Sequence, residues 1–189
     1  MFTSEERERY QSHMAIPEFG EESQRKLKQS KILVIGAGGL GCPVLEYLSA
    51  AGIGMLGLID GSSIRLSDLH RQILYSISDI GQLKAEIATR KLRAINNNIL
   101  YNCYPYPIDE AKAKEIIPLY DVIVVATNNS ECQQLVAAAC IKYQKKMITG
   151  SAKGFLGQVA AFDFKEKEQF EQLSVNSFGS EDKSLGVMG

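Results

Sequence analysis

A short apolar strand that runs directly into a glycine-rich turn constrains this chain more than any other feature of its sequence. The segment KILVIG (Lys31–Gly36) is rich in β-branched residues, which is typical of a buried parallel strand. The turn Gly36-Ala37-Gly38-Gly39-Leu40-Gly41 follows at once and has the spacing G-x-G-x-x-G. The residues after it, up to Gly52, carry apolar side chains near helical spacing. This order of strand, turn and helix predicts a nucleotide-binding unit.

Each glycine of the turn has an expected task. Gly36 permits the tight turn, Gly38 removes a side chain that would block a phosphate, and Gly41 lets the helix and the strand pack closely. The helix N-terminus then presents free backbone N–H groups and a partial positive charge to that phosphate. The alternative is a packing turn without a ligand, and the strand and helix on either side make it the weaker interpretation.

The second predicted strand, MLGLID, ends at Asp60, about 20 residues beyond the glycines. A carboxylate at that place can accept hydrogen bonds from the hydroxyl groups of a ribose. The alternative is a cap or turn residue in a polar loop. Asp60 and the glycines together predict a nucleotide, but they fit NAD, FAD and ATP alike and do not identify a reaction.

Strands and helices alternate along the rest of the chain, which predicts a Rossmann-like α/β fold, with a mainly parallel sheet and helices on both faces. We expect further strands near 99–104, 121–127, 146–149 and 157–164, helices at 83–95 and 131–144, and a short helix that Asp109 caps and Pro118 closes. The expected organisation is an N-terminal segment at 1–29 that is helical in two pieces, a nucleotide-binding domain at 30–164 with irregular helical turns at 61–80, and an irregular tail at 165–189.

The charge balance and the cysteines narrow the class of function. With 21 Lys and Arg against 22 Asp and Glu, the net charge of −1 gives no reason to expect a nucleic-acid partner. The apolar stretches fall short of the ~18 residues that a membrane helix needs, and the charged start is not a secretory signal. Four cysteines without a C-x-x-C pair favour reduced thiols over a zinc site. We therefore expect a cytoplasmic protein that binds neither nucleic acid, nor membrane, nor zinc.

Basic residues beyond Asp60 distinguish between the possible nucleotides. Arg71 and Gln72 stand in SDLHRQIL, and Lys84 opens a predicted helix in GQLKAE. A hydride-transfer enzyme has no general need for two cations near the phosphates. Attack at an α-phosphate does need them, because charge builds on the phosphate oxygens and on the leaving pyrophosphate. Each residue alone is more often a solvated surface group, so spacing does not carry this assignment by itself.

The ordered motifs of the chain resemble those of the ThiF/MoeB/HesA family, relatives of the ubiquitin-activating enzymes. They are G-x-G-G-L-G, L-x-D, S-D-L-x-R-Q, G-x-x-K-A, Thr127-Asn128-Asn129, TGSAKGFLGQV at 149–159 and the closing LGVMG. The resemblance implies ATP and Mg²⁺ as ligands. It also implies adenylation of the C-terminal Gly-Gly carboxylate of a ubiquitin-like sulfur-carrier protein of the ThiS or MoaD type, for thiamin or molybdopterin synthesis, by a homodimer.

The resemblance further implies roles for individual residues. Gly38, Gly39 and Gly41 would lie along the phosphates of ATP, and Gly36 belongs to the same nucleotide site as the residue of the tight turn. The side chains expected to contact the triphosphate are Arg71, Gln72 and Lys84. Of these, Arg71 and Lys84 would be the catalytic cations, and Asp60 would hold the ribose.

Three departures from the family pattern bear on catalysis. The family aspartate that helps to hold Mg²⁺ falls on Asn128, whose amide keeps an oxygen but lacks the charge, which makes it a poorer ligand for the metal. The family's nearby arginine falls on Gln133, and the arginine that reaches the triphosphate across the dimer interface falls on Ser12. The family's paired C-x-x-C motifs are absent, and the chain stops at Gly189 where relatives continue.

Three hypotheses follow from these observations. The first is an adenylyltransferase acting on a ubiquitin-like sulfur carrier. The second is a catalytically impaired homologue that binds nucleotide or carrier as a non-catalytic partner, and it is motivated by Asn128, Gln133 and Ser12. The third is an NAD(P)-dependent oxidoreductase that shares only the glycine turn, although nothing downstream suggests a nicotinamide pocket.

Overall fold

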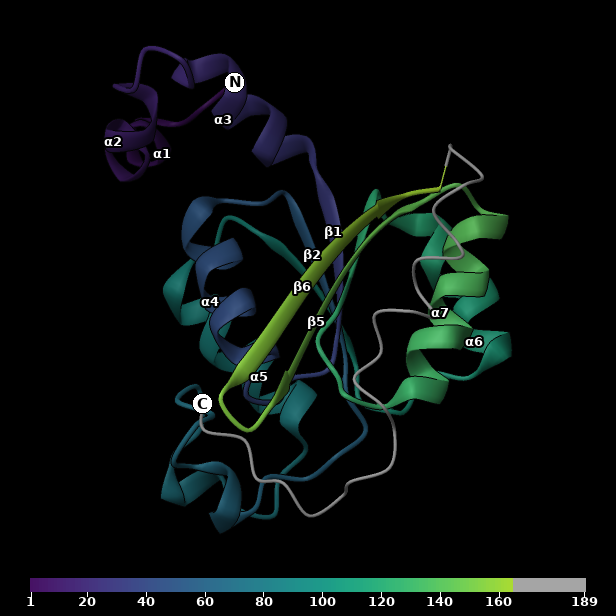
Figure 1. Ribbon diagram of the computed structural model, residues 1–189. Coiled ribbons are helices and arrows are strands. Elements are labelled where there is room, and N and C mark those ends of the chain that lie inside the picture. The colour runs from purple at the N-terminus through teal and green to yellow at the C-terminus, as the bar shows by residue number, and fades with distance from the viewer. Residues whose placement is uncertain (165–189) are drawn as a thin grey trace.

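In this computed structural model, which describes residues 1–164, a six-stranded sheet carries helices on both faces (Figure 1). The strands are β1 (Lys31–Ile35), β2 (Met55–Ile59), β3 (Leu100–Tyr104), β4 (Val122–Val125), β5 (Lys146–Lys153) and β6 (Leu156–Asp163). Their order is β3-β2-β1-β4-β5-β6, in which the first five are parallel and β6 runs antiparallel to β5. The predicted α/β fold with a mainly parallel sheet is confirmed.

The helices divide between the two faces of the sheet, with α4 and α5 on one and α6 and α7 on the other (Figure 1). The α-helices are α1 (Ser4–Arg9), α2 (Gln11–Met14), α3 (Gly20–Gln29), α4 (Gly41–Ala51), α5 (Lys84–Ile95), α6 (Glu110–Ile116) and α7 (Ser130–Lys142). Three short 3-10 helices are η1 (Leu66–Asp68), η2 (Ile77–Asp79) and η3 (Ile117–Leu119). Each face buries its own apolar cluster, which explains why the central strands are apolar on both sides.

Local signals in the sequence set several of these boundaries. Gly52 ends α4 in the left-handed conformation, with φ of 84°. The carboxylate of Asp109 accepts a hydrogen bond from the backbone N–H of Lys112 at 2.8 Å and caps α6, and Pro118 lies in the 3-10 turn that follows. The strand predicted at 146–149 instead runs to Lys153, because all eight residues of β5 pair with β6.

The structure adds a helix to the prediction for the N-terminal segment, whereas the predicted C-terminal tail is not described. The N-terminal segment, predicted as two helical pieces, contains three helices, since the first piece is interrupted at Tyr10. The predicted tail at 165–189, with its LGVMG motif, lies outside the described residues, so the division of the chain into three segments stays a prediction. Within residues 1–164, no helix combines the length and the apolar character that crossing a bilayer requires.

The segment 61–83 between β2 and α5 is irregular, as predicted for 61–80, and Asp79 organises part of it. Its side chain is only 4% exposed and pairs with Arg90 at 3.3 Å and with Lys91 at 2.5 Å. The carboxylate also accepts the backbone N–H and the hydroxyl of Ser76. Hydrogen bonds from Lys91 and Ser76 lower the pKa of Asp79 from 3.8 to about 2, although burial opposes the shift.

This low pKa predicts a loss of stability in acid. Because the folded protein binds the proton of Asp79 less readily than the unfolded chain, the stabilisation is complete above about pH 4 and disappears as the pH falls towards 2. We expect the free energy of unfolding to fall by about 1–2 kcal/mol more over that interval in the wild type than in Asp79→Asn. Urea titrations at a series of pH values measure this difference, and identical slopes for both proteins would contradict it.

Candidate nucleotide-binding site

The glycine turn joins β1 to α4, and its glycines differ in whether an added side chain would have room. At Gly36, with φ of 100°, an added Cβ would lie 2.7 Å from the carbonyl oxygen of Ala126, and at Gly41 it would overlap the carbonyl oxygen of Gly36. At Gly38 the nearest atom to an added Cβ is the Nε2 of Gln72, at 3.8 Å. The backbone therefore requires Gly36 and Gly41, whereas Gly38 leaves an open surface over the turn.

Asp60 lies at the end of β2 and contacts the turn directly. Its carboxylate accepts the backbone N–H of Ala37 at 2.8 Å and that of Ser62 at 2.7 Å. Each carboxylate oxygen has a second lone pair, so these bonds leave acceptor capacity on both oxygens. The structure brings Asp60 to the glycine turn, where it can both hold the backbone and receive a ribose hydroxyl.

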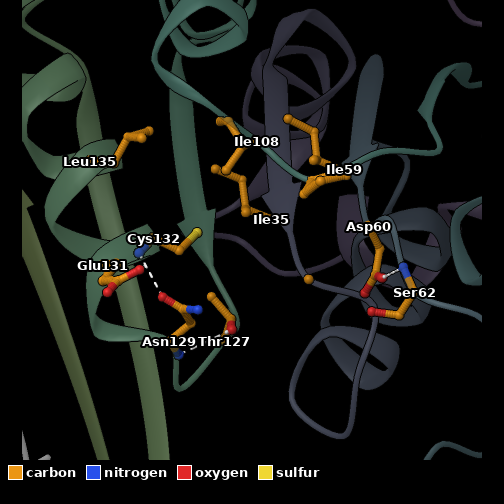
Figure 2. Close-up of a pocket in the computed structure, with 12 residues that line it drawn as sticks. Ile35, Ile59, Asp60, Ser62, Ile108, Thr127, Asn129, Glu131, Cys132 and Leu135 are labelled. Atoms are coloured by element: carbon orange, nitrogen blue, oxygen red, sulfur yellow. Dashed lines mark hydrogen bonds between the residues drawn. The ribbon is translucent and has the colours of Figure 1, made fainter.

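A pocket of about 370 Å³ opens beside Asp60, at the carboxyl ends of the parallel strands (Figure 2). Its apolar side chains are Ile35, Ile59, Pro107, Ile108, Cys132 and Leu135, and its polar ones are Asp60, Ser62, Thr127, Asn129 and Glu131. The pocket lies between the ends of β1 and β4, where the chain switches direction across the sheet and where open α/β sheets bind ligands. An apolar slot with a polar rim suits a flat heterocyclic base attached to a ribose.

The segment 61–83 carries two of the predicted residues to the turn. The Nη1 atom of Arg71 lies 2.8 Å from the place that a Cβ on Gly39 would take, so its guanidinium lies against Gly39 and leaves Gly38 open. Gln72 is 1% exposed and faces Gly38. Arg71 and Gln72 therefore flank the surface along which the resemblance places the phosphates.

Lys84, the third predicted residue, is buried and already paired. It is the first residue of α5, and its Nζ lies 3.1 Å from a carboxylate oxygen of Asp68. The other oxygen of Asp68 accepts a hydrogen bond from the Nε2 of Gln72 at 3.1 Å. Asp68 thus links Lys84 to Gln72, a role that the sequence analysis did not assign to it. Asp68 is the aspartate of the S-D-L-x-R-Q motif, which is the one sequence signal that could have identified it.

Tyr75 is a second residue of the site that sequence reasoning missed. Its hydroxyl lies 2.9 Å from the carbonyl oxygen of Ala37 and 3.4 Å from that of Lys84, so it connects the glycine turn to the start of α5. Burial raises the pKa of Tyr75, which keeps the hydroxyl protonated as a donor. The thiol of Cys42 also donates to the carbonyl of Ala37, at 3.4 Å. These bonds fix the peptide that precedes Gly38.

Replacing Tyr75 with phenylalanine is expected to loosen the turn. The change removes one buried hydrogen bond, which should lower the free energy of unfolding by about 1 kcal/mol and weaken ATP binding about fivefold. Tyr101→Phe is the matched control, because its buried hydroxyl bonds to the carbonyl oxygens of Leu92 and Asn96 in α5 and its C-cap. We expect the control to lose similar stability and to keep its ATP affinity. Equal ATP affinities for the two variants in calorimetric titrations would refute this role of Tyr75.

Two of the residues that depart from the family pattern, Asn128 and Gln133, form hydrogen bonds with nearby backbone groups. The side chain of Asn128 donates to the carbonyl oxygen of Ala152 in β5 at 3.1 Å and accepts its backbone N–H at 3.5 Å. Gln133 donates to the carbonyl oxygen of Thr127 at 2.7 Å. Ser12 is exposed on α2. In residues 1–164, no group of three or more His, Cys, Asp or Glu side chains is placed to hold a metal ion.

Known proteins with the same motifs have related sequences and folds. The model of the ThiF family matches residues 10–188. The sulfur carrier protein adenylyltransferase of Thermus thermophilus is 40% identical over 161 residues, which are 85% of this chain and 59% of that protein. A probable molybdopterin-synthase adenylyltransferase of Porphyra purpurea is 38% identical over 175 residues, 93% of this chain and 46% of that protein. The chain thus spans about half the length of these relatives.

Solved structures agree with the sequence comparison. The crystal structure of Escherichia coli MccB with ATP is 28% identical, has a TM-score of 0.70, and matches 74% of this chain and 42% of that one. Escherichia coli tRNA N6-threonylcarbamoyladenosine dehydratase, TcdA, is 23% identical with a TM-score of 0.76, over 82% of this chain and 64% of that one, and shows the shared fold. Since the family model covers almost all of the sequence, the chain belongs to the ThiF family.

Proposed function

We propose that this chain adenylates the C-terminal carboxylate of a ubiquitin-like sulfur-carrier protein with ATP. The observation that carries the proposal is the juxtaposition of Arg71 and Gln72 with an open glycine turn at the edge of an apolar pocket. A base in the pocket and a ribose at Asp60 would direct the phosphates along Gly38 and Gly39. The adenylyltransferase names of the relatives support the same reaction class.

The proposed reaction forms one bond and breaks one. A carboxylate oxygen of the carrier attacks the α-phosphorus, and the bond from phosphorus to the bridging oxygen breaks, so pyrophosphate leaves with the electron pair. Negative charge grows on the phosphate oxygens during this step, and Arg71 and Lys84 would stabilise it. Mg²⁺ would neutralise further phosphate charge when bound. We expect it to take its oxygen ligands from the triphosphate, because the amide of Asn128 is engaged with Ala152.

Carrier-dependent exchange of labelled pyrophosphate into ATP tests this function. The expected result is exchange above background with a ThiS-like or a MoaD-like carrier, and the comparison of the two identifies the pathway. Absence of exchange with carriers that an active relative accepts would contradict the proposal. A cytoplasmic location remains a prediction from the sequence.

A homodimer is part of the same proposal. Three apolar side chains of the segment 61–83, those of Leu66, Ile73 and Ile77, are at least 70% exposed, and the same segment carries Arg71 and Gln72. Several large apolar side chains exposed on one short segment favour a protein contact. Sedimentation equilibrium should give a dimer in the wild type and a monomer in Ile73→Asp, and a wild-type monomer at micromolar concentration would exclude this arrangement.

The second candidate function is a nucleotide-binding partner without catalysis. Its support is Asn128, since an amide makes both bonds to Ala152, whereas an aspartate could not donate to the carbonyl oxygen. If this candidate holds, the wild type binds ATP without exchange and Asn128→Asp restores exchange. If the first holds, the wild type catalyses exchange and Asn128→Asp does not increase it, because the substitution removes a contact with β5.

A further inference from the structure

The strongest unexplained feature of the site is the buried ion pair between Lys84 and Asp68. The side chains of Lys84 and Asp68 are 8% and 5% exposed, and their charged atoms are 3.1 Å apart. A buried charge is stable only when it is paired, so the positive charge of Lys84 has a resident partner before any phosphate arrives. A lysine that is expected to stabilise phosphate charge is therefore neutralised within the protein itself.

Other groups hold Asp68 in its charged form. Burial alone would raise the pKa of Asp68, but the backbone N–H of Arg65 and the ammonium group of Lys84 lower it below its usual value. The oxygen that contacts Lys84 also accepts the N–H of Arg65 at 3.0 Å. The carboxylate thus keeps its negative charge close to the glycine turn.

Gln72 connects this pair to the turn and has an unused acceptor. Its Nε2 donates to Asp68 and faces Gly38, while its Oε1 is buried and has no hydrogen-bond partner among residues 1–164. A buried acceptor without a partner is costly, and a ligand or a displaced donor can satisfy it. The ammonium group of Lys84 has three donors and is bonded to the same carboxylate. The hydrogen bonds among Asp68, Gln72 and Lys84 can therefore be exchanged when a ligand binds.

We propose that Asp68 is a positioning residue that acts as the counter-ion of Lys84 in the nucleotide-free protein and sets the affinity for triphosphate and pyrophosphate. The inference rests on the proposed function. An incoming phosphate must share Lys84 with Asp68 or displace it, and the carboxylate also repels the phosphate itself. Asp68 therefore weakens the binding of both ATP and pyrophosphate, which favours release of the leaving group after each reaction.

Replacing Asp68 with asparagine tests this proposal. The substitution removes the charge and keeps an acceptor for the N–H of Arg65, and its new amide N–H can reach Gln72 once that side chain turns its oxygen. We expect the Kd values of ATP and of pyrophosphate each to fall about tenfold in calorimetric titrations. The Kd of adenosine, which carries no phosphate, should change less than about twofold.

Three further variants separate a charge effect from a structural one. Asp79→Asn neutralises another buried, ion-paired aspartate of the same segment and should leave the ATP affinity unchanged. In a Lys84→Met background, Asp68→Asn should no longer produce the full gain, because the two residues act through one pair. Asp68→Ser is the second neutral variant, should the asparagine variant fail to fold.

The outcomes distinguish this inference from the proposed function. If the wild type does not bind ATP, both are wrong. If the wild type binds ATP and Lys84→Met weakens that binding, but the neutral variants of Asp68 bind ATP no more tightly than the wild type, only the inference is overturned. An equal gain in the affinity for adenosine would also overturn it, because that gain would not depend on phosphate.

Discussion

Replacing Arg71 with alanine is expected to reduce carrier-dependent pyrophosphate exchange by about 100-fold or more. The loss of one preorganised group that stabilises charge in the transition state has an effect of this size in other enzymes. Arg71 is the cation that the structure places directly over the glycine turn, and the three atoms nearest to an added Cβ on Gly39 all belong to its side chain. The guanidinium group presents a fork of donors to phosphate oxygens, so Arg71→Lys should recover only part of the rate.

Arg90→Ala is the matched control for this experiment. Arg90 is an arginine of α5 whose side chain is 64% exposed and pairs with Asp79, so its removal should leave exchange within about twofold of the wild type. The rates are measured at saturating carrier and varied ATP, which separates a defect in turnover from a defect in binding. Wild-type rates in Arg71→Ala would remove this residue from the mechanism.

Replacing two glycines of the same turn with alanine is expected to have large but different effects on ATP affinity and stability, because their surroundings differ. Gly38→Ala should leave the free energy of unfolding within about 1 kcal/mol of the wild type, because the new methyl group meets only Gln72, at 3.8 Å. It should weaken ATP binding about 100-fold, since the methyl group would occupy the surface along which a phosphate lies. Gly41→Ala should lower the free energy of unfolding by about 3 kcal/mol or more, because its methyl group overlaps the backbone of Gly36.

Gly157→Ala in β6 controls for the effect of an added methyl group. The nearest atom to its Cβ, the carbonyl oxygen of Ser151, would be 4.0 Å away, so neither stability nor ATP affinity should change appreciably. Thermal unfolding and calorimetric titration of the three variants give both quantities. If Gly38→Ala bound ATP as the wild type does, the phosphates could not lie on this turn.

Local sequence signals were sufficient for much of this site. The glycine turn, the position of Asp60 at the end of a strand and the helix that begins at Lys84 all depend on residues close together in the sequence. The backbone requirement for Gly36 and Gly41 follows from the tight passage between β1 and α4. These features are predictable because the residues that determine each of them lie within one short segment of the sequence.

The missed features depend on contacts between distant segments. Tyr75 reaches Ala37 across 38 residues, and Asn128 reaches Ala152 across 24. The pairing of Lys84 with Asp68 depends on how the segment 61–83 folds back on α5, for which no periodic pattern exists. A sequence motif therefore predicted a role for Lys84 but not the carboxylate that pairs with it. In the proposed function, that carboxylate sets how strongly Lys84 attracts a phosphate.

A calorimetric titration of ATP into the wild-type chain, followed by the same titration into Gly38→Ala, decides whether ATP binds on the glycine turn. We expect saturable binding with one ATP per chain in the wild type and a large loss of affinity in the variant. If the wild type gave no saturable heat at millimolar ATP, or if both proteins bound ATP equally well, the proposed nucleotide site would be wrong.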